Sequence, residues 1–162
     1  METLISIHSS SKEDRYKEIL PQIESLIRNE SDFIANLANT SAALKLALGV
    51  DASWVGFYMH KPRELVLGPF QGKPACVRIQ IGRGVCGIAA KEKRTIVVPD
   101  VTKFPGHIFC DPQSKSEIVV PLLRNNEVIG VLDVDSASLN AFDKTDQLYL
   151  EQVSALLVER LA

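Results

Sequence analysis

The chain has 162 residues, of which 46% are hydrophobic and 23% charged. This length lies within the usual range of one domain and is enough to bury one substantial core, so we predict a single domain spanning residues 1–162. Eighteen basic and 20 acidic residues give a formal net charge of −2, without a basic stripe or a block of like charge. This pattern argues against a polyanionic partner, and we expect no nucleic-acid binding.

The pattern of apolar residues predicts two helices near the N-terminus. Ser10 and Glu13 match a capping box, and apolar residues follow at helical spacing up to residue 27, although Pro21 is expected to break or kink this helix. Ser31 is expected to begin a second helix, with Gly49 at its C-terminal end.

Strand-forming residues dominate much of the remaining sequence. Strands are expected at 52–59, 64–70, 75–81, 94–100, 116–123 and 127–136. A short helix is expected at 84–93, and a long helix from Asp143, whose side chain can cap it. Helices around a run of mainly neighbouring strands predict an α+β fold, with a central antiparallel sheet flanked by helices.

The N-terminal segment METLISIHSSSKED lacks the apolar stretch of a signal peptide, and we identify no apolar run of membrane-spanning length. We therefore expect a cytoplasmic protein without a membrane partner. Cytoplasmic thiols are kept reduced, so a disulfide in that compartment is more often transient and catalytic than structural.

Two pairs of side chains indicate a binding site. Side chains alternate along a strand, which places Trp54 and Tyr58 on one face with a gap over Gly56 between them, unless the two rings are only a core pair. The same period places Asp133 and Asp135 together on a mostly apolar strand, where they repel each other and lose hydration unless a cation or several donors meet them. The alternative for the acids is a strand end that runs into solvent.

The three cysteines are Cys76, Cys86 and Cys110, and they form no CxxC pair. Zinc sites usually have closely paired ligands such as C-x2-C, and only His107 and Cys110 have such spacing, so no metal site is predicted. Cys86 lies where a helix is expected to begin, and the helix dipole would lower its thiol pKa, which makes it a candidate nucleophile. Cys110 lies in a polar loop with His107 and Glu117 near it in sequence, whereas Cys76 lies on an expected strand, where a packed core thiol is the simplest interpretation.

Five segments, in order, resemble the free methionine-(R)-sulfoxide reductases, which are built on a GAF domain. The segments are W-V-G-F-Y, G-P-F-Q-G-K-P-A-C, G-x-G-V-C-G, H-I-x-C-D followed by S-x-S-E, and G-V-L-D-V-D-S. The resemblance runs from about Ser10 to the C-terminus. It implies an oxidoreductase that acts on the free amino acid, not on protein-bound sulfoxide.

The resemblance also implies roles for the thiols. Cys110 matches the attacking cysteine, and Cys76 matches the cysteine that resolves its sulfenic acid into an intramolecular disulfide. Cys86 matches a cysteine of less settled role and stays the second choice for the nucleophile. Recycling by thioredoxin, no organic or metal cofactor and a homodimer are further expectations.

The resemblance assigns the binding residues as well. Trp54 and Tyr58 match an aromatic wall around the substrate methyl group, and Glu117, Asp133 and Asp135 match acidic polar contacts. We expect Glu117 to protonate or hydrogen-bond the departing oxygen. One of the two aspartates would pair with the substrate ammonium group.

Two other functions stay open at this point. One is a stand-alone GAF sensor for a small ligand such as a cyclic nucleotide, although a sensor usually needs an output domain and 162 residues leave little room for one. The other is a redox-sensing regulator, because reactive thiols serve both purposes.

Overall fold

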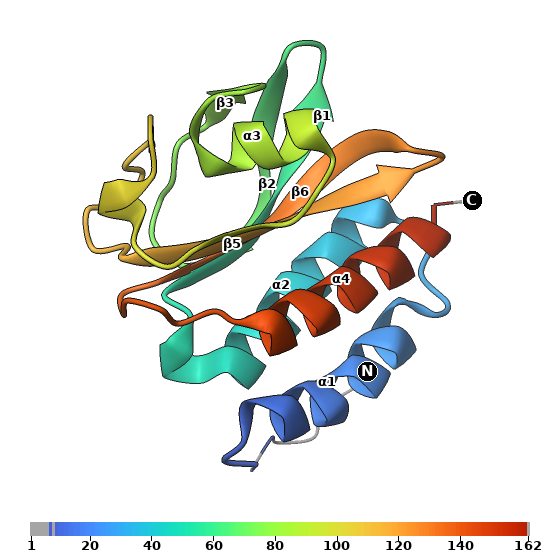
Figure 1. Cartoon of the computed structure of the whole chain (residues 1–162). Coiled ribbons are helices and arrows are strands. Elements are labelled where there is room, and N and C mark those ends of the chain that lie inside the picture. The colour runs from blue at the N-terminus through green and yellow to red at the C-terminus, as the bar shows by residue number, and fades with distance from the viewer. Residues whose placement is uncertain (1–6, 8, 162) are drawn as a thin grey trace.

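The computed structural model describes residue 7 and residues 9–161 (Figure 1). Residues 1–6 and 8 lie outside the described residues. They belong to the N-terminal segment in which no signal peptide was predicted. The elements are α1 (Lys12–Ile27), α2 (Phe33–Leu48), η1 (Gly49–Asp51), β1 (Trp54–Lys61), β2 (Glu64–Gln71), β3 (Arg78–Gln80), α3 (Gly84–Glu92), β4 (Ile96–Val98), η2 (Val101–Lys103), β5 (Ser116–Arg124), β6 (Glu127–Ser136) and α4 (Lys144–Glu159).

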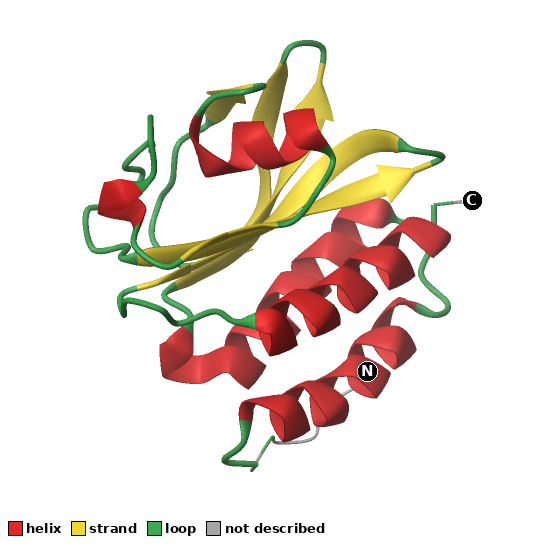
Figure 2. Cartoon of the chain, viewed as in Figure 1, coloured by secondary structure: helices red, strands yellow, loops and turns green. Residues whose placement is uncertain are grey.

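These six strands form one antiparallel sheet in the order β3-β2-β1-β6-β5-β4. Helices α2 and α4 cover one face of the sheet, and α1 packs against both of them as an outer layer (Figures 1 and 2). Helix α3 and the loops around it cover the opposite face. The predicted α+β class with a central antiparallel sheet is therefore confirmed.

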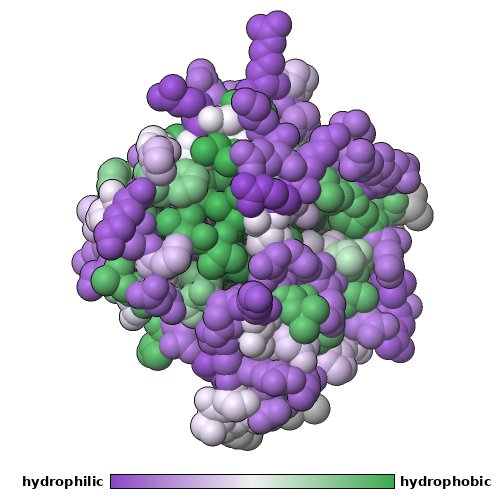
Figure 3. Space-filling view, in the orientation of Figure 1, coloured by the Kyte–Doolittle hydropathy of each residue, from purple (hydrophilic) through white to green (hydrophobic). Residues whose placement is uncertain are grey.

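Alternating residues of each central strand feed two separate apolar clusters. On β1, Val55 and Phe57 belong to the cluster under α1, α2 and α4, whereas Trp54 and Tyr58 belong to the cluster under α3. Both faces of the strand are thus buried, which is why it reads as a nearly continuous apolar run. On the outside, hydrophilic residues cover much of the face in Figure 3, and apolar surface gathers toward the side of α3.

The first helix differs from the prediction at two points. Its N-cap is Ser11, whose side chain accepts a hydrogen bond from the Asp14 amide, and not Ser10. The helix also continues through Pro21, so the predicted break is wrong. An interior proline costs about 3 kcal/mol. Pro21 is on the exposed side, while Ile19 and Ile23 are buried on the other, so packing of the buried stripe offsets that cost.

The other predicted helix ends are close to those observed. Asp32, one residue after the predicted Ser31, caps α2 by accepting a hydrogen bond from the Ala35 amide. Gly49 ends α2 with a positive φ of 57°, as predicted. Asp143 caps α4 as predicted, and Asp146 completes a capping box with it.

The segment Phe33–Asp51 is, by length and composition, apolar enough to cross a membrane, contrary to the prediction for this sequence. Helices in the core of a folded domain can have the same length and composition. In the most apolar 18-residue stretch of this segment, 44% is buried. Helix α2 packs against β1, β2 and α1. Its apolar character is accounted for by its place in the core.

The strand predicted at 75–81 is much shorter in the structure. Only Arg78–Gln80 pair, with Glu64–Val66 of β2, so Cys76 lies in the preceding loop. Pro74 has no amide hydrogen to donate to a ladder, which is consistent with the late start of the strand. The interpretation of Cys76 as a packed strand thiol is therefore wrong.

Candidate active site

The registers of three central strands bring the predicted aromatic and acidic residues together. Asp135 of β6 lies opposite Trp54 on β1 and opposite Glu117 on β5, so these three residues form a row across the sheet. Two positions along β6, Asp133 lies opposite Gly56 of β1. Because side chains alternate, both positions project to the face that α3 covers.

The aromatic wall is packed more tightly than the sequence predicts. The Trp54 ring lies over Gly56, since a Cβ at position 56 would come within 2.5 Å of ring atom Cη2. Trp54 also stacks on Phe70 and on Tyr58, with ring centroids 5.3 and 6.0 Å apart. Its Nε1 donates to the Lys73 carbonyl oxygen at 3.1 Å. The expected gap is thus filled by the Trp54 ring, which is both a core residue and a wall of the pocket.

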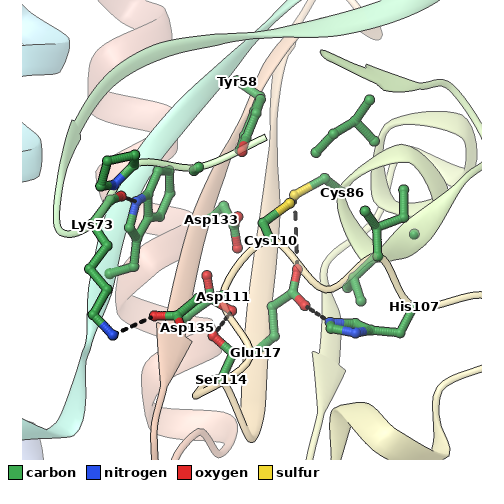
Figure 4. Close-up of a pocket in the computed structure, with 17 residues that line it drawn as sticks. Tyr58, Lys73, Cys86, His107, Cys110, Asp111, Ser114, Glu117, Asp133 and Asp135 are labelled. Atoms are coloured by element: carbon green, nitrogen blue, oxygen red, sulfur yellow. Dashed lines mark hydrogen bonds and ion pairs between the residues drawn. The ribbon is translucent and has the colours of Figure 1, made fainter. Parts of the chain in front are cut away.

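A pocket lies between this wall, the N-terminal part of α3 and the loop that precedes β5 (Figure 4). Seven of the eight predicted site residues line it: Trp54, Tyr58, Cys86, Cys110, Glu117, Asp133 and Asp135. The eighth, Cys76, is absent from the lining but is attached to it through Cys110.

Cys76 and Cys110 form a disulfide, with an S–S distance of 2.11 Å and a Cα–Cα distance of 5.3 Å. Both cysteines are half-buried. The bond joins the loop after β2 to the loop before β5, and the Tyr58 hydroxyl donates to the Cys76 carbonyl oxygen at 3.0 Å. This is the pairing that the family resemblance implies.

Cys86 is a free thiol near the start of α3, and only 3% of it is exposed. Its Sγ lies 3.9 Å from Oε1 of Glu117. Burial, followed by the nearby charge of Asp133, raises the pKa of this thiol well above its usual value. The predicted lowering by the helix dipole is therefore wrong, because desolvation and neighbouring carboxylates outweigh the partial charge of the helix terminus.

Glu117 and Asp133 are buried, and Asp135 is half-buried beside them. Burial, as the first cause, raises the pKa of Glu117 and of Asp133 well above the usual range, and the charge of Asp135 adds to both effects. Burial likewise raises the pKa of Asp135 to about 6, against a hydrogen bond from the Ser114 hydroxyl at 2.9 Å that lowers it. Within the described residues, Oδ1 of Asp133 has no hydrogen-bond partner.

This acidic cluster fits a cation. Cys86, Glu117 and Asp133 each offer one atom within 4.8 Å of the others, a spacing that suits a metal ion. Carboxylates also bind an ammonium group closely. Either one would favour the ionised carboxylates, whose burial without a counter-charge is costly.

Several lining residues escaped the site prediction. His107, noted in the sequence only as a neighbour of Cys110, has its Nε2 3.2 Å from Oε2 of Glu117. Lys73 lies near Asp111, with Nζ and Oδ2 3.5 Å apart, and so links the same two loops as the disulfide. Ser114 holds Asp135. These residues lie in loops, where no period of two or 3.6 indicates a side chain's direction.

The fold and this site define a GAF domain, and the family model described as "GAF domain" matches residues 37–161. "GAF domain-containing protein A" of Dictyostelium discoideum is 54% identical over 154 residues, which cover 94% of this chain and 96% of that protein. The Escherichia coli "Free methionine-R-sulfoxide reductase" is 47% identical over 152 residues, with 94% and 92% covered.

A similar solved structure is the free methionine-R-sulfoxide reductase of Neisseria meningitidis in complex with its substrate. It matches with a TM-score of 0.96 and 51% identity, over 99% of this chain and 96% of that chain. The chain belongs to the free methionine-(R)-sulfoxide reductase family of GAF-domain proteins.

Proposed function

We propose that this protein reduces free L-methionine-(R)-sulfoxide to methionine, with Cys110 as the nucleophile. One observation carries the proposal: a disulfide between Cys76 and Cys110 lies at a pocket that holds an aromatic wall and buried carboxyl groups. Membership of the family supports the same reaction.

Substrate binding uses the two sides of the pocket. The substrate ammonium group pairs with Asp133 and Asp135, and Oδ1 of Asp133, which has no hydrogen-bond partner in the described part of the chain, supports this assignment. The methyl group on the sulfoxide sulfur lies against Trp54 and Tyr58. Enclosing the ammonium group leaves no room for a preceding peptide bond, so peptide-bound sulfoxide is excluded.

The chemistry proceeds in two balanced steps. The Cys110 thiolate attacks the sulfoxide sulfur, and Glu117 gives its proton to the departing oxygen, so that methionine leaves, Cys110 becomes a sulfenic acid and Glu117 becomes a carboxylate. Cys76 then gives its proton, through Glu117, to the sulfenic hydroxyl group, and its sulfur displaces water to form the disulfide. Burial raises the pKa of Glu117, which favours the protonated carboxyl group that an acid needs before the reaction, and this supports its role.

The disulfide is reduced by a dithiol protein of the thioredoxin class. A dithiol with a potential of about −270 mV is suited to this exchange. The dithiol gives up two protons in this exchange. One stays on Cys76, and the other passes from Cys110 to Glu117, which restores the Cys110 thiolate and the neutral Glu117 carboxyl group. Val77, Ile108 and Phe109, which lie within two residues of Cys76 or Cys110, are exposed by 60%, 36% and 59%, and they offer apolar surface to such a partner.

Three further assignments belong to this proposal. The protein functions in the cytoplasm, where thiol reductants are present. Residues 1–162 act as one domain, since α1, which lies outside the matched family model, packs against α2 and α4. A homodimer stays an expectation from the family resemblance.

An NADPH-coupled thioredoxin assay tests the proposal. We expect one methionine for each NADPH consumed with free L-methionine-(R)-sulfoxide, and almost no turnover with the S epimer or with N-acetylmethionine sulfoxide. A redox sensor would form the disulfide with peroxide but release no methionine from the sulfoxide. Equal rates on free and N-acetylated substrate would contradict the proposed binding of the ammonium group.

A further inference from the structure

His107 lies three residues before Cys110, and its ring is held in one place. Its Nε2 lies 3.2 Å from Oε2 of Glu117, and the two side chains are exposed by only 5% and 7%. The ring of Phe109 packs edge-on against the imidazole, with centroids 4.5 Å apart. The other carboxyl oxygen of Glu117, Oε1, points toward Cys86 in the pocket (Figure 4).

We propose that His107 is a positioning residue that donates Nε2–H to Oε2 of Glu117 and so keeps the acid proton on Oε1, facing the substrate. This inference rests on the proposed function, in which Glu117 is the acid. After the proton has left, the same N–H holds the carboxylate that remains. His107 forms and breaks no covalent bond in this role, so the balance of atoms and electrons in the two reaction steps stays the same.

The second ring nitrogen favours this tautomer. Nδ1 of His107 is buried and, among the described residues, has no hydrogen-bond partner. A neutral imidazole has one donor and one acceptor nitrogen. A proton on Nδ1 would bury a donor without an acceptor, which is rare and costly. A proton on Nε2 has an acceptor, because Oε2 of Glu117 can accept its hydrogen bond.

The charges around the pair support neutral partners before the reaction. Glu117 is faced by Asp133 and Asp135 from β6 and by Cys86 from α3. Burial raises the pKa of Glu117, and burial lowers the pKa of His107 against the opposing effect of Asp135. A neutral acid beside a neutral imidazole is the form that can donate from Oε1.

Two variants separate hydrogen bonding from packing. His107→Gln keeps an amide donor near the position of Nε2, whereas His107→Phe keeps a ring of similar size without a donor. We expect the Phe variant to slow methionine release in a single turnover by about 10- to 100-fold, the range for losing a hydrogen bond to a charged group, with KM little changed. The Gln variant should stay within a few-fold of wild type.

The pH profile distinguishes positioning from a structural effect. Without the N–H, the Glu117 carboxylate is less stable and its pKa rises further, so the alkaline limb of the rate profile should move to higher pH in His107→Phe. His60→Phe, on the exposed end of β1, is the matched control and should leave both rate and profile unchanged. Equal losses in the Gln and Phe variants, with the alkaline limb in place, would overturn the proposal.

A spectroscopic readout is independent of turnover. A long-range 1H–15N spectrum of the disulfide form, with His107→Phe used to assign one of the three histidines, reports which imidazole nitrogen carries the proton. We expect the Nε2–H tautomer, and the Nδ1–H tautomer would contradict the inference. Wild-type protein that releases no methionine would instead refute the proposed reaction, while this spectrum still tests the His107–Glu117 contact.

Discussion

Two buried aspartates on opposite sides of the sheet differ in their hydrogen-bond partners. On the helix side, Asp146 accepts hydrogen bonds from the Tyr16 hydroxyl at 2.8 Å, from Lys12 Nζ at 2.6 Å and from the Asp143 amide at 2.8 Å. On the α3 side, Oδ1 of Asp133 has no partner among the described residues, and its neighbours are other acids.

This difference distinguishes a carboxyl group that stabilises the fold from the carboxyl groups of the pocket. A buried carboxylate that supports the fold is fully paired, because an unpaired one costs several kcal/mol. Among the described residues, Oδ1 of Asp133 lacks such pairing, and burial raises the pKa of Asp133 and of its neighbour Glu117, which would suit a pocket that receives a cation and gives up a proton. Substitutions on the two sides should therefore fail in different ways.

The largest effect is expected on catalysis at the α3 side. Glu117→Gln keeps the shape of a neutral acid but has no proton of suitable acidity, so kcat should fall by about 10²- to 10⁴-fold. The free energy of unfolding, measured with denaturant, should not fall. A variant that is destabilised but retains full activity per folded molecule would place Glu117 among structural residues.

A matched pair tests the comparison through stability. Asp146→Asn removes the charge that Lys12 faces and weakens the α4 cap, and we expect a loss of about 3 kcal/mol, at the lower end for breaking a buried ion pair. Asp133→Asn should leave the free energy of unfolding unchanged or raise it, because no paired charge is lost. Equal losses in both variants would remove the distinction between the two sides.

Asp135 should make stability depend on pH. Its pKa is raised from 3.8 to about 6, so between these values the folded state holds more protons than the unfolded state. Stability from this group is therefore lost as pH rises from about 4 to 6, by up to about 3 kcal/mol, and then stays constant. Comparing urea unfolding of wild type and Asp135→Asn at pH 4 to 7 checks this, and a pH-independent difference between them would contradict it.

The smallest effect concerns the wall of the pocket. Trp54→Phe keeps the stacking on Tyr58 and Phe70 but removes the hydrogen bond from Nε1 to the Lys73 carbonyl, so a loss of about 1 kcal/mol is expected. Substrate KM should rise by a few-fold as the wall loosens. An unchanged KM together with the full stability loss would make Trp54 a core residue only.

The sequence predicted best what depends on the period of strands. Trp54 and Tyr58 share a face of β1, and Asp133 and Asp135 share a face of β6, because side chains alternate. That the two pairs lie on the same face of the sheet depends on the register of β1 against β6, which the sequence did not predict. The short helix at 84–93 was placed well, but the burial of Cys86 depends on how α3 packs on the sheet, so its pKa was predicted in the wrong direction.

The loops were the part that local patterns could not predict. The pairing of Cys76 with Cys110 followed from the family resemblance alone, since spacing left it open. His107 and Ser114 reach Glu117 and Asp135 only because the loop before β5 folds over the pocket. The helix through Pro21 likewise depends on packing that a local rule does not include.

The central claim is the assignment of Cys110 as nucleophile and Cys76 as resolving thiol. Quenched single-turnover assays with mass spectrometry, on reduced Cys110→Ser, Cys76→Ser and Cys86→Ser, test it most directly. Cys76→Ser should release about one equivalent of methionine and stop with a sulfenic acid on Cys110, whereas Cys110→Ser should release none. Release by Cys110→Ser together with none by Cys86→Ser would show that the buried Cys86 is the nucleophile, and would contradict the account.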